Sequence, residues 1–158
     1  MAERNYWLVK SEPGAYSWDD LCGEEDRTAE WDGVRNYQAR NLLRDRMKVG
    51  DGVLFYHSNA KPMSVVGTAV VVREGYPDDT AWDPDSEHPD PKSTPDKPIW
   101  YMVDIKAEKE LNRPITLEEI KSTPGLEGMV LVNRSRLSVQ PVKPEEFQTI
   151  VDLGMSVA

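Results

Sequence analysis

The chain has 158 residues, one cysteine and a formal net charge of −9 at pH 7. A chain of this length can bury roughly 70% of its unfolded surface, so we expect one domain, residues 1–158, with a substantial core. One cysteine excludes an internal disulfide and a cysteine-based zinc site. The acidic balance argues against tight, sequence-blind binding to nucleic acid, which needs many phosphate contacts. No apolar stretch is long enough to span a bilayer, and nothing at the N-terminus resembles a signal peptide, so we expect a cytoplasmic protein without a membrane partner.

The first half of the chain predicts one strand, a short helical turn and a longer amphipathic helix. Aromatic and β-branched side chains indicate the strand, and Ser17 has the spacing of a capping box at the start of the turn. Asn36 is suited to be the N-cap of the helix. The charged residues 23–30 predict a solvated loop. The expected bounds are residues 5–10 for the strand, 17–21 for the turn and 36–47 for the helix.

The second half predicts several strands, a long loop and a final helix. Residues 77–98 contain six prolines and six aspartates, and loops of this length in compact domains are functional or mobile. Thr116 has capping-box spacing, and Pro144 suits the first position of a helix that ends at Gly154. Strands are expected at 52–57, 65–73, 99–106 and 137–139. This order predicts an α+β fold with a curled, mostly antiparallel sheet surrounded by helices.

The segment before the longer helix concentrates residues suited to binding. Trp31 stands near Gly33, which allows a ligand to approach the backbone closely. Arg35, Asn36 and the free N–H groups of a helix start can donate hydrogen bonds to a carbonyl or phosphate. The alternative interpretation is an ordinary helix cap that follows a tryptophan of the core.

Two further groups stand where predicted strands end, and one aromatic residue stands in the long loop. Lys10, Ser11 and Glu12 end the first strand, where Lys10 and Glu12 project from the same side, although a simple exposed ion pair would use the same residues. Ser58 and Asn59 can donate to and accept from a base edge, but they also suit a turn.

Trp82 is the aromatic residue of the long loop. A tryptophan in such a polar loop either docks the loop on the core or covers a ligand.

Motifs for hydrolysis and for nucleotide binding are missing from the sequence. It contains no G-x-S-x-G elbow, P-loop or G-x-G-x-x-G. The two histidines, His57 and His88, are too few for a histidine-based metal site. We therefore expect no catalytic residues, no metal and no cofactor.

These segments together resemble the EVE domain of the PUA-like superfamily, as in the thymocyte nuclear protein family and in bacterial single-domain proteins. The similarity covers nearly the whole chain in order, and it is densest at 6–13, 31–41 and 49–59. It implies a PUA-like curled sheet or pseudo-barrel surrounded by helices. It also implies a pocket that holds a modified nucleobase in DNA or RNA, such as a modified cytosine or adenine. Transferred to this sequence, the pocket residues are Lys10, Ser11, Glu12, Trp31, Arg35, Asn36, Ser58, Asn59 and Trp82.

Two other functions stay open beside the base-binding module. Some PUA-like relatives place a lysine and a carboxylate in the equivalent cleft, so Lys10 and Glu12 could serve a small hydrolase that acts on a modified nucleoside. A small-metabolite sensor also fits the acidic composition. The base-binding hypothesis predicts weak binding of a single base, and it leaves room for a partner protein that holds the nucleic-acid strand.

Overall fold

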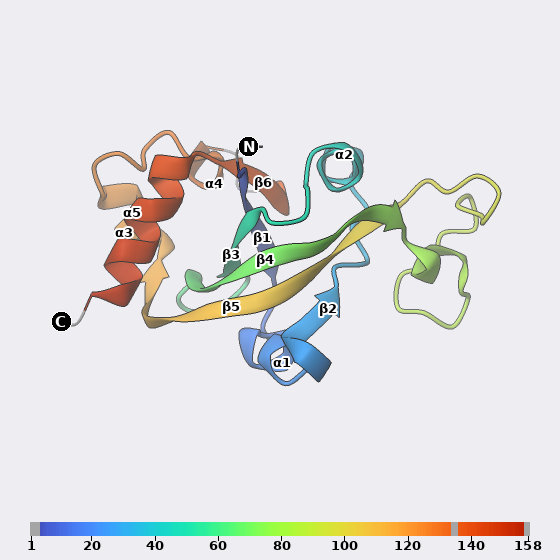
Figure 1. Ribbon diagram of the computed structural model, residues 1–158, viewed down its shortest axis with the longest axis horizontal. Helices are drawn as coiled ribbons and strands as arrows, with labels where there is room; N and C mark the ends of the chain where they lie inside the picture. Colours follow the sequence, from blue (N-terminus) through green and yellow to red (C-terminus); the bar gives the residue numbers. More distant parts are fainter. Residues whose placement is uncertain (1–3, 134–135, 157–158) are drawn as a thin grey trace.

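The computed structural model describes residues 4–133 and 136–156, and its strands form one mixed sheet (Figure 1). The strand order is β2-β5-β4-β3-β1-β6, with β1 parallel to β3 and the other described pairs antiparallel. The strands are β1 (Tyr6–Ser11), β2 (Thr28–Glu30), β3 (Gly52–His57), β4 (Ser64–Pro77), β5 (Tyr101–Thr116) and β6 (Val139–Val142). The predicted α+β class is confirmed. The sheet is mostly antiparallel, as predicted, and it is open, with β2 and β6 at its edges.

Alternation along the central strands divides the core into two clusters. Because successive side chains of a strand point to opposite faces, Trp7 and Phe55 belong to one cluster, and Leu8 and Leu54 belong to the other. The first cluster includes apolar side chains of α2 (Tyr37–Asp45), and the second includes those of α5 (Pro144–Met155). In Figure 1, α5 and α3 lie at one end of the molecule, and the 78–100 segment projects from the other.

The helix starts follow the local capping signals of the sequence. The remaining helical elements are α1 (Trp18–Cys22), α3 (Leu117–Ser122), α4 (Val130–Asn133) and the short 3-10 turns η1 (Glu25–Arg27) and η2 (Asp79–Trp82). Ser17 and Asp20 form the predicted capping box, with hydrogen bonds of 3.1 and 2.8 Å. Asn36 Oδ1 accepts a hydrogen bond of 2.9 Å from the Ala39 amide, so it is the N-cap of α2 as predicted.

The prediction of a solvated loop over residues 23–30 is wrong. This segment contains η1 and the edge strand β2, whose residue Ala29 pairs with Ile105 of β5. Polar side chains on a short edge strand do not produce the apolar alternation that marks a half-buried strand.

Other boundaries differ from those expected, and the reasons are tertiary. β4 and β5 are longer than predicted because they pair with each other along most of their length, and β6 begins two residues later than expected. α5 continues past Gly154 to Met155, and a Cβ at Gly154 would lie 2.6 Å from a methyl carbon of Leu111. Thr116 caps α3, but the Glu119 carboxylate binds Arg113 at 2.8 Å and does not complete the predicted box.

α2 lies close to β4 because one residue of that strand has no side chain. A Cβ at Gly75 would come within 2.6 Å of the Leu43 carbonyl oxygen and 2.8 Å of Arg44 Cα. The helix is therefore held at short range against β4.

Among the described residues, none of the helices has the length and apolar character that a bilayer crossing requires. The cytoplasmic location stays a prediction.

Candidate functional site

A cleft of about 980 Å³ opens between the end of β1, the edge strand β2 and the segment that joins β2 to α2. Residues 10–12 and 15–16 line one side, residues 28–35 line another, and Glu87 and His88 of the long loop close a third. The cleft therefore brings together segments that lie far apart in the sequence. Two of the segments that the sequence singled out, at Lys10 and at Trp31, share this one cleft.

A buried carboxylate fixes the β2–α2 segment to the start of the long loop. Asp78 is fully buried, and it accepts hydrogen bonds from the Gly33 amide at 2.9 Å and from Arg35 Nη1 at 3.0 Å. It also caps η2 by accepting from the Thr80 amide at 3.0 Å. Burial alone would raise the pKa of Asp78, but the hydrogen bonds from Thr80, Gly33 and Arg35 hold it below its ordinary value. Asp78 thus positions one wall of the cleft without lining it.

His88, from the long loop, lines the cleft beside this wall. Its ring packs against Gly33, where a Cβ would lie 2.7 Å from the imidazole and where φ is +75°, so both the contact and the backbone favour glycine. Arg35 Nη2 donates to the His88 carbonyl oxygen at 2.6 Å, and Thr80 Oγ1 lies 3.0 Å from His88 Nδ1. The proline- and aspartate-rich loop is therefore tied to the cleft at His88.

Trp31 is a core residue with one edge at the cleft. It is 8% exposed, and its ring meets Phe55 edge-on at 5.5 Å and Tyr16 at 6.2 Å. Its amide donates to the Val103 carbonyl at 2.7 Å. The alternative interpretation, a tryptophan of the core, describes most of this side chain, and little of its face is left for stacking.

Tyr16 was not selected from the sequence, yet it lines the cleft beside Trp31. Its hydroxyl oxygen is buried and has no hydrogen-bond partner within the described part of the chain. Burial, followed by the carboxylates of Glu24 and Asp20, raises the pKa of Tyr16 to about 12, so the hydroxyl keeps its proton. A buried donor without a partner costs about 1–3 kcal/mol, which a ligand oxygen could offset.

The cleft is strongly acidic. Its lining contains eight carboxylates and two basic side chains, Lys10 and Arg35. Burial raises the pKa of Asp32, and burial together with Asp104 raises the pKa of Glu30. Burial also lowers the pKa of Lys10. This field repels phosphate and favours groups that donate hydrogen bonds.

The cleft is lined by five of the nine predicted pocket residues: Lys10, Ser11, Glu12, Trp31 and Arg35. The other four lie outside the lining. Asn36 caps α2, the Ser58 amide donates to the Ser11 carbonyl at 2.9 Å, Asn59 is an exposed turn residue with φ of +49°, and half-buried Trp82 ends η2. Their contact with a ligand stays a prediction.

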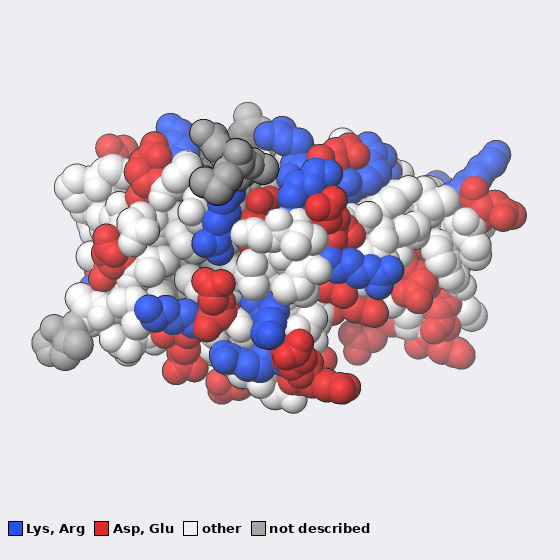
Figure 2. Space-filling view, viewed as in Figure 1, with Lys and Arg blue, Asp and Glu red and all other residues white. Residues whose placement is uncertain are grey.

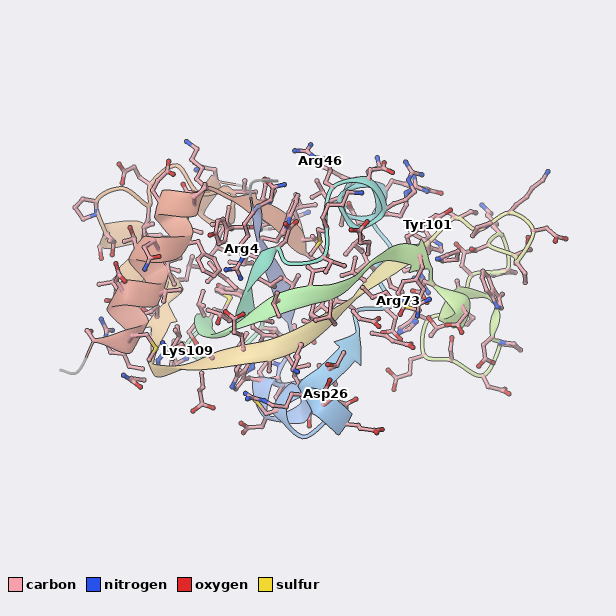
Figure 3. All side chains as sticks on the ribbon, viewed as in Figure 1. Arg4, Asp26, Arg46, Arg73, Tyr101 and Lys109 are labelled. Carbon is pink, nitrogen blue, oxygen red and sulfur yellow. The ribbon has the colours of Figure 1, made fainter. Side chains whose placement is uncertain are left out.

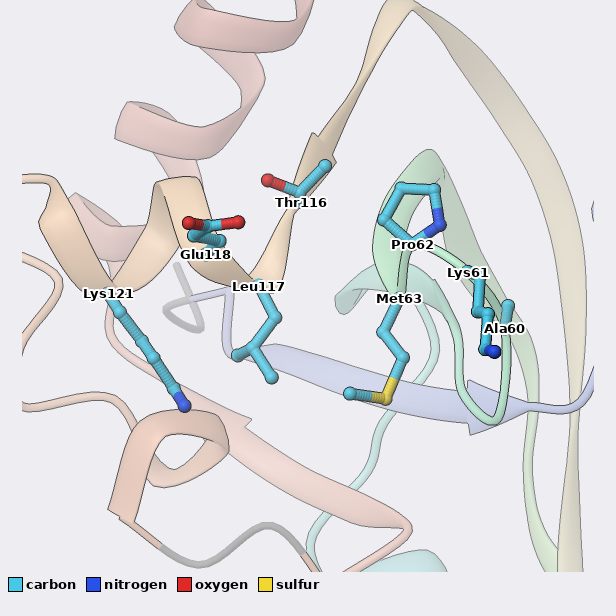
Figure 4. A pocket seen from close by; sticks show the side chains of 8 residues that line it. All are labelled: Ala60, Lys61, Pro62, Met63, Thr116, Leu117, Glu118 and Lys121. Atoms are coloured by element: carbon cyan, nitrogen blue, oxygen red, sulfur yellow. The ribbon is translucent and has the colours of Figure 1, made fainter.

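A second, smaller hollow of about 500 Å³ lies between the 60–63 turn and α3 (Figure 4). Met63 and Leu117 line it, with Lys61, Glu118 and Lys121 at its edges. It contains none of the predicted pocket residues. In residues 4–133 and 136–156, no three His, Cys, Asp or Glu side chains are grouped to hold a metal ion.

The sequence pattern of the EVE domain family matches residues 5–153. This chain belongs to the EVE domain family. Thymocyte nuclear protein 1 of Mus musculus is 46% identical over 94% of this chain and 73% of its own length. A hypothetical protein from Leishmania major has a TM-score of 0.91 and 49% identity, covering 96% of this chain and 95% of that one.

A third EVE relative has been solved with nucleic acid. The human THYN1 protein, in complex with DNA that contains 5-methylcytosine, has a TM-score of 0.90 and 41% identity, covering 98% of this chain and 99% of that one. The resemblance inferred from the sequence is confirmed at the level of family and fold.

Proposed function

We propose that this EVE domain binds a modified cytosine of DNA and holds the base in the cleft between β1, β2 and His88. The observation that carries the proposal is the acidic wall around Asp32, which suits the donor edge of cytosine. The complex of the human THYN1 protein with 5-methylcytosine-containing DNA supports the same ligand class.

The wall selects for cytosine by its hydrogen-bonding character. A carboxylate accepts from the exocyclic amino group of cytosine, whereas thymine presents a carbonyl oxygen at the same position. An anionic oxygen opposite that carbonyl is repelled and leaves two acceptors facing each other. Each such hydrogen-bonding match discriminates against the wrong base by about 1–3 kcal/mol, or roughly 5- to 150-fold in affinity.

Asp32 is the carboxylate we assign to the amino group, and Tyr16 is the donor we assign to the ring carbonyl once its buried hydroxyl turns toward the cleft. Asp32 lines the cleft with its side chain 35% exposed, and the Tyr16 hydroxyl needs an acceptor. The methyl group contributes less, because one methyl in an apolar slot is worth on the order of 1–3 kcal/mol. We therefore expect weak binding of the isolated nucleoside, in the micromolar range or above.

The test compares 5-methyl-2′-deoxycytidine with thymidine, two nucleosides that both carry the methyl and differ at the hydrogen-bonding edge. We expect the wild-type protein to prefer the cytidine by about tenfold or more in calorimetric titrations. In Asp32→Asn, the preference should fall toward one, because an amide can pair with either edge by donating and accepting. The nucleoside recovered afterwards should have unchanged mass, whereas hydrolysis would favour the enzyme alternative at Lys10 and Glu12.

The same variant separates a binding defect from a folding defect. Burial raises the folded-state pKa of Asp32, so the folded state favours the protonated carboxyl group. The stability that the protonated form contributes is lost as the pH rises through that pKa. Asp32→Asn should therefore melt no lower than wild type at neutral pH. Asp96→Asn, an exposed change outside the cleft, is the matched control and should keep the preference. Equal affinity of the wild type for both nucleosides would refute the assignment.

A further inference from the structure

The acidic cleft requires that the phosphates of any bound strand lie elsewhere, and one helix meets that requirement. Residues 35–48 contain five Lys or Arg side chains and one carboxylate, Asp45, in a chain with a net charge of −9. Figure 2 shows Lys and Arg gathered over α2, and Figure 3 places Arg46 there. We define the α2 basic surface as Arg40, Arg44, Arg46 and Lys48.

The α2 basic surface begins at the rim of the cleft. Arg35 lines the cleft, the next residue caps α2, and Arg40 and Arg44 follow one turn apart on the helix. Arg44 pairs with exposed Asp45 at 2.8 Å, and a surface ion pair of this kind contributes little and is easily exchanged. Arg46 is exposed, and none of its side-chain atoms makes a hydrogen bond or ion pair with another described residue. Lys48 and its partner Glu74 are both about half exposed at 3.7 Å, so that ion pair contributes little and is easily exchanged.

An exposed aromatic residue at the start of α2 contacts the first of these cations. Tyr37 is 59% exposed and stacks on buried Trp100 with ring centroids 4.9 Å apart. The Arg40 guanidinium lies 5.1 Å from the Tyr37 ring centre and is held by the Ile99 carbonyl at 2.7 Å. A fixed aromatic ring beside basic side chains is the arrangement that single-stranded nucleic acid uses for base stacking and phosphate pairing.

We infer that the α2 basic surface binds the phosphates that flank the base in the cleft, with Tyr37 against the neighbouring base. This inference rests on the proposed function for the identity of the base, and it adds the path of the strand. Recognition of the base and attraction of the backbone are then carried by separate surfaces of opposite charge.

The experiment measures binding of a fluorescein-labelled, single-stranded 12-nucleotide DNA with one central 5-methylcytosine, by anisotropy at several salt concentrations. Each phosphate contact contributes about 0.7 to the salt slope of a single strand, so Arg44→Gln with Arg46→Gln should reduce the slope by about 1.4. The affinity at low salt should fall about tenfold or more, equally for methylated and unmethylated strands. The control is Lys109→Gln with Lys121→Gln, which makes the same charge change on β5 (Figure 3) and at the smaller hollow beside α3 (Figure 4).

The outcomes distinguish this inference from the proposed function. Free 5-methyl-2′-deoxycytidine should bind the α2 variant as it binds wild type. A salt slope that does not change in the α2 variant, or that changes equally in the control, overturns the inference while nucleoside binding still supports the cleft. If only the α2 variant loses oligonucleotide binding and no protein binds the nucleoside, phosphate binding by the α2 basic surface is supported and base binding in the cleft is refuted.

Discussion

Asp78→Ala is expected to lower the free energy of unfolding by about 3–5 kcal/mol, the usual cost of removing one partner of a buried ion pair. Asp78 is fully buried, and its loss would leave the Gly33 amide and the Arg35 guanidinium without their acceptor. Because Asp78 joins the β2–α2 segment to the long loop, the cleft should open as well. Urea unfolding followed by circular dichroism measures the first effect, and nucleoside titration measures the second.

The pH dependence of this difference has a defined sign. The folded-state pKa of Asp78 is lowered, so its stabilisation is present above the ordinary aspartate pKa and is lost as the pH falls through the folded-state value. The difference in the free energy of unfolding between wild type and Asp78→Ala should therefore become smaller at acidic pH. Asp79→Ala, an exposed neighbour, should change stability by only about 0.5 kcal/mol. If Asp78→Ala were as stable as Asp79→Ala, Asp78 would not hold the β2–α2 segment to the long loop as we describe.

Trp31→Ala is the second large effect, and we expect it to be mainly a loss of stability. Trp31 is 8% exposed and packs edge-on against Phe55 and Tyr16, so truncation leaves a cavity in the core. Substitutions of this kind typically cost about 3–5 kcal/mol. Thermal and urea unfolding of Trp31→Ala and Trp31→Phe, compared at one pH, measure the loss, and the phenylalanine should recover much of it.

The result also decides what Trp31 does in binding. If Trp31→Ala kept wild-type stability and lost only nucleoside affinity, the tryptophan would be a stacking platform, as the sequence first suggested, and our description of it as a core residue would be wrong. If stability falls as expected, loss of binding in this variant carries no information about direct contact with the base.

Local signals were readable from the sequence, and tertiary ones were not. The Asn36 cap and the Ser17 box depend on residues three apart, so their chemistry is visible in the chain. β2 was missed because its stability comes from pairing with β5, 74 to 78 residues away, and its three residues, Thr28–Glu30, include only one apolar side chain.

The same distinction holds for the candidate site. Lys10 and Trp31 stood out because their neighbours formed dense motifs, and both line the cleft. Asp78 and His88 did not stand out, since each acts through a partner more than 40 residues away. Tyr16 and Asp32 belong to no motif that signals binding in the sequence. Only the structure shows that they line the same cleft.

The acidic composition, which first argued against nucleic acid, has a structural explanation in this account. Eight of the 28 acidic side chains line the cleft, where their charge repels phosphate, and five cations lie in residues 35–48, which begin at the cleft with Arg35. A protein with net negative charge can therefore bind one base of a strand while keeping the backbone outside.

The most direct test of the central claim is to map where 5-methyl-2′-deoxycytidine binds, by two-dimensional NMR of the nitrogen-15-labelled protein. We predict saturable shifts of the Ser11, Trp31 and Gly33 amides, which surround the cleft, and none at Leu117 in the smaller hollow. Shifts centred on Leu117, or no shifts at saturating nucleoside, would contradict the account.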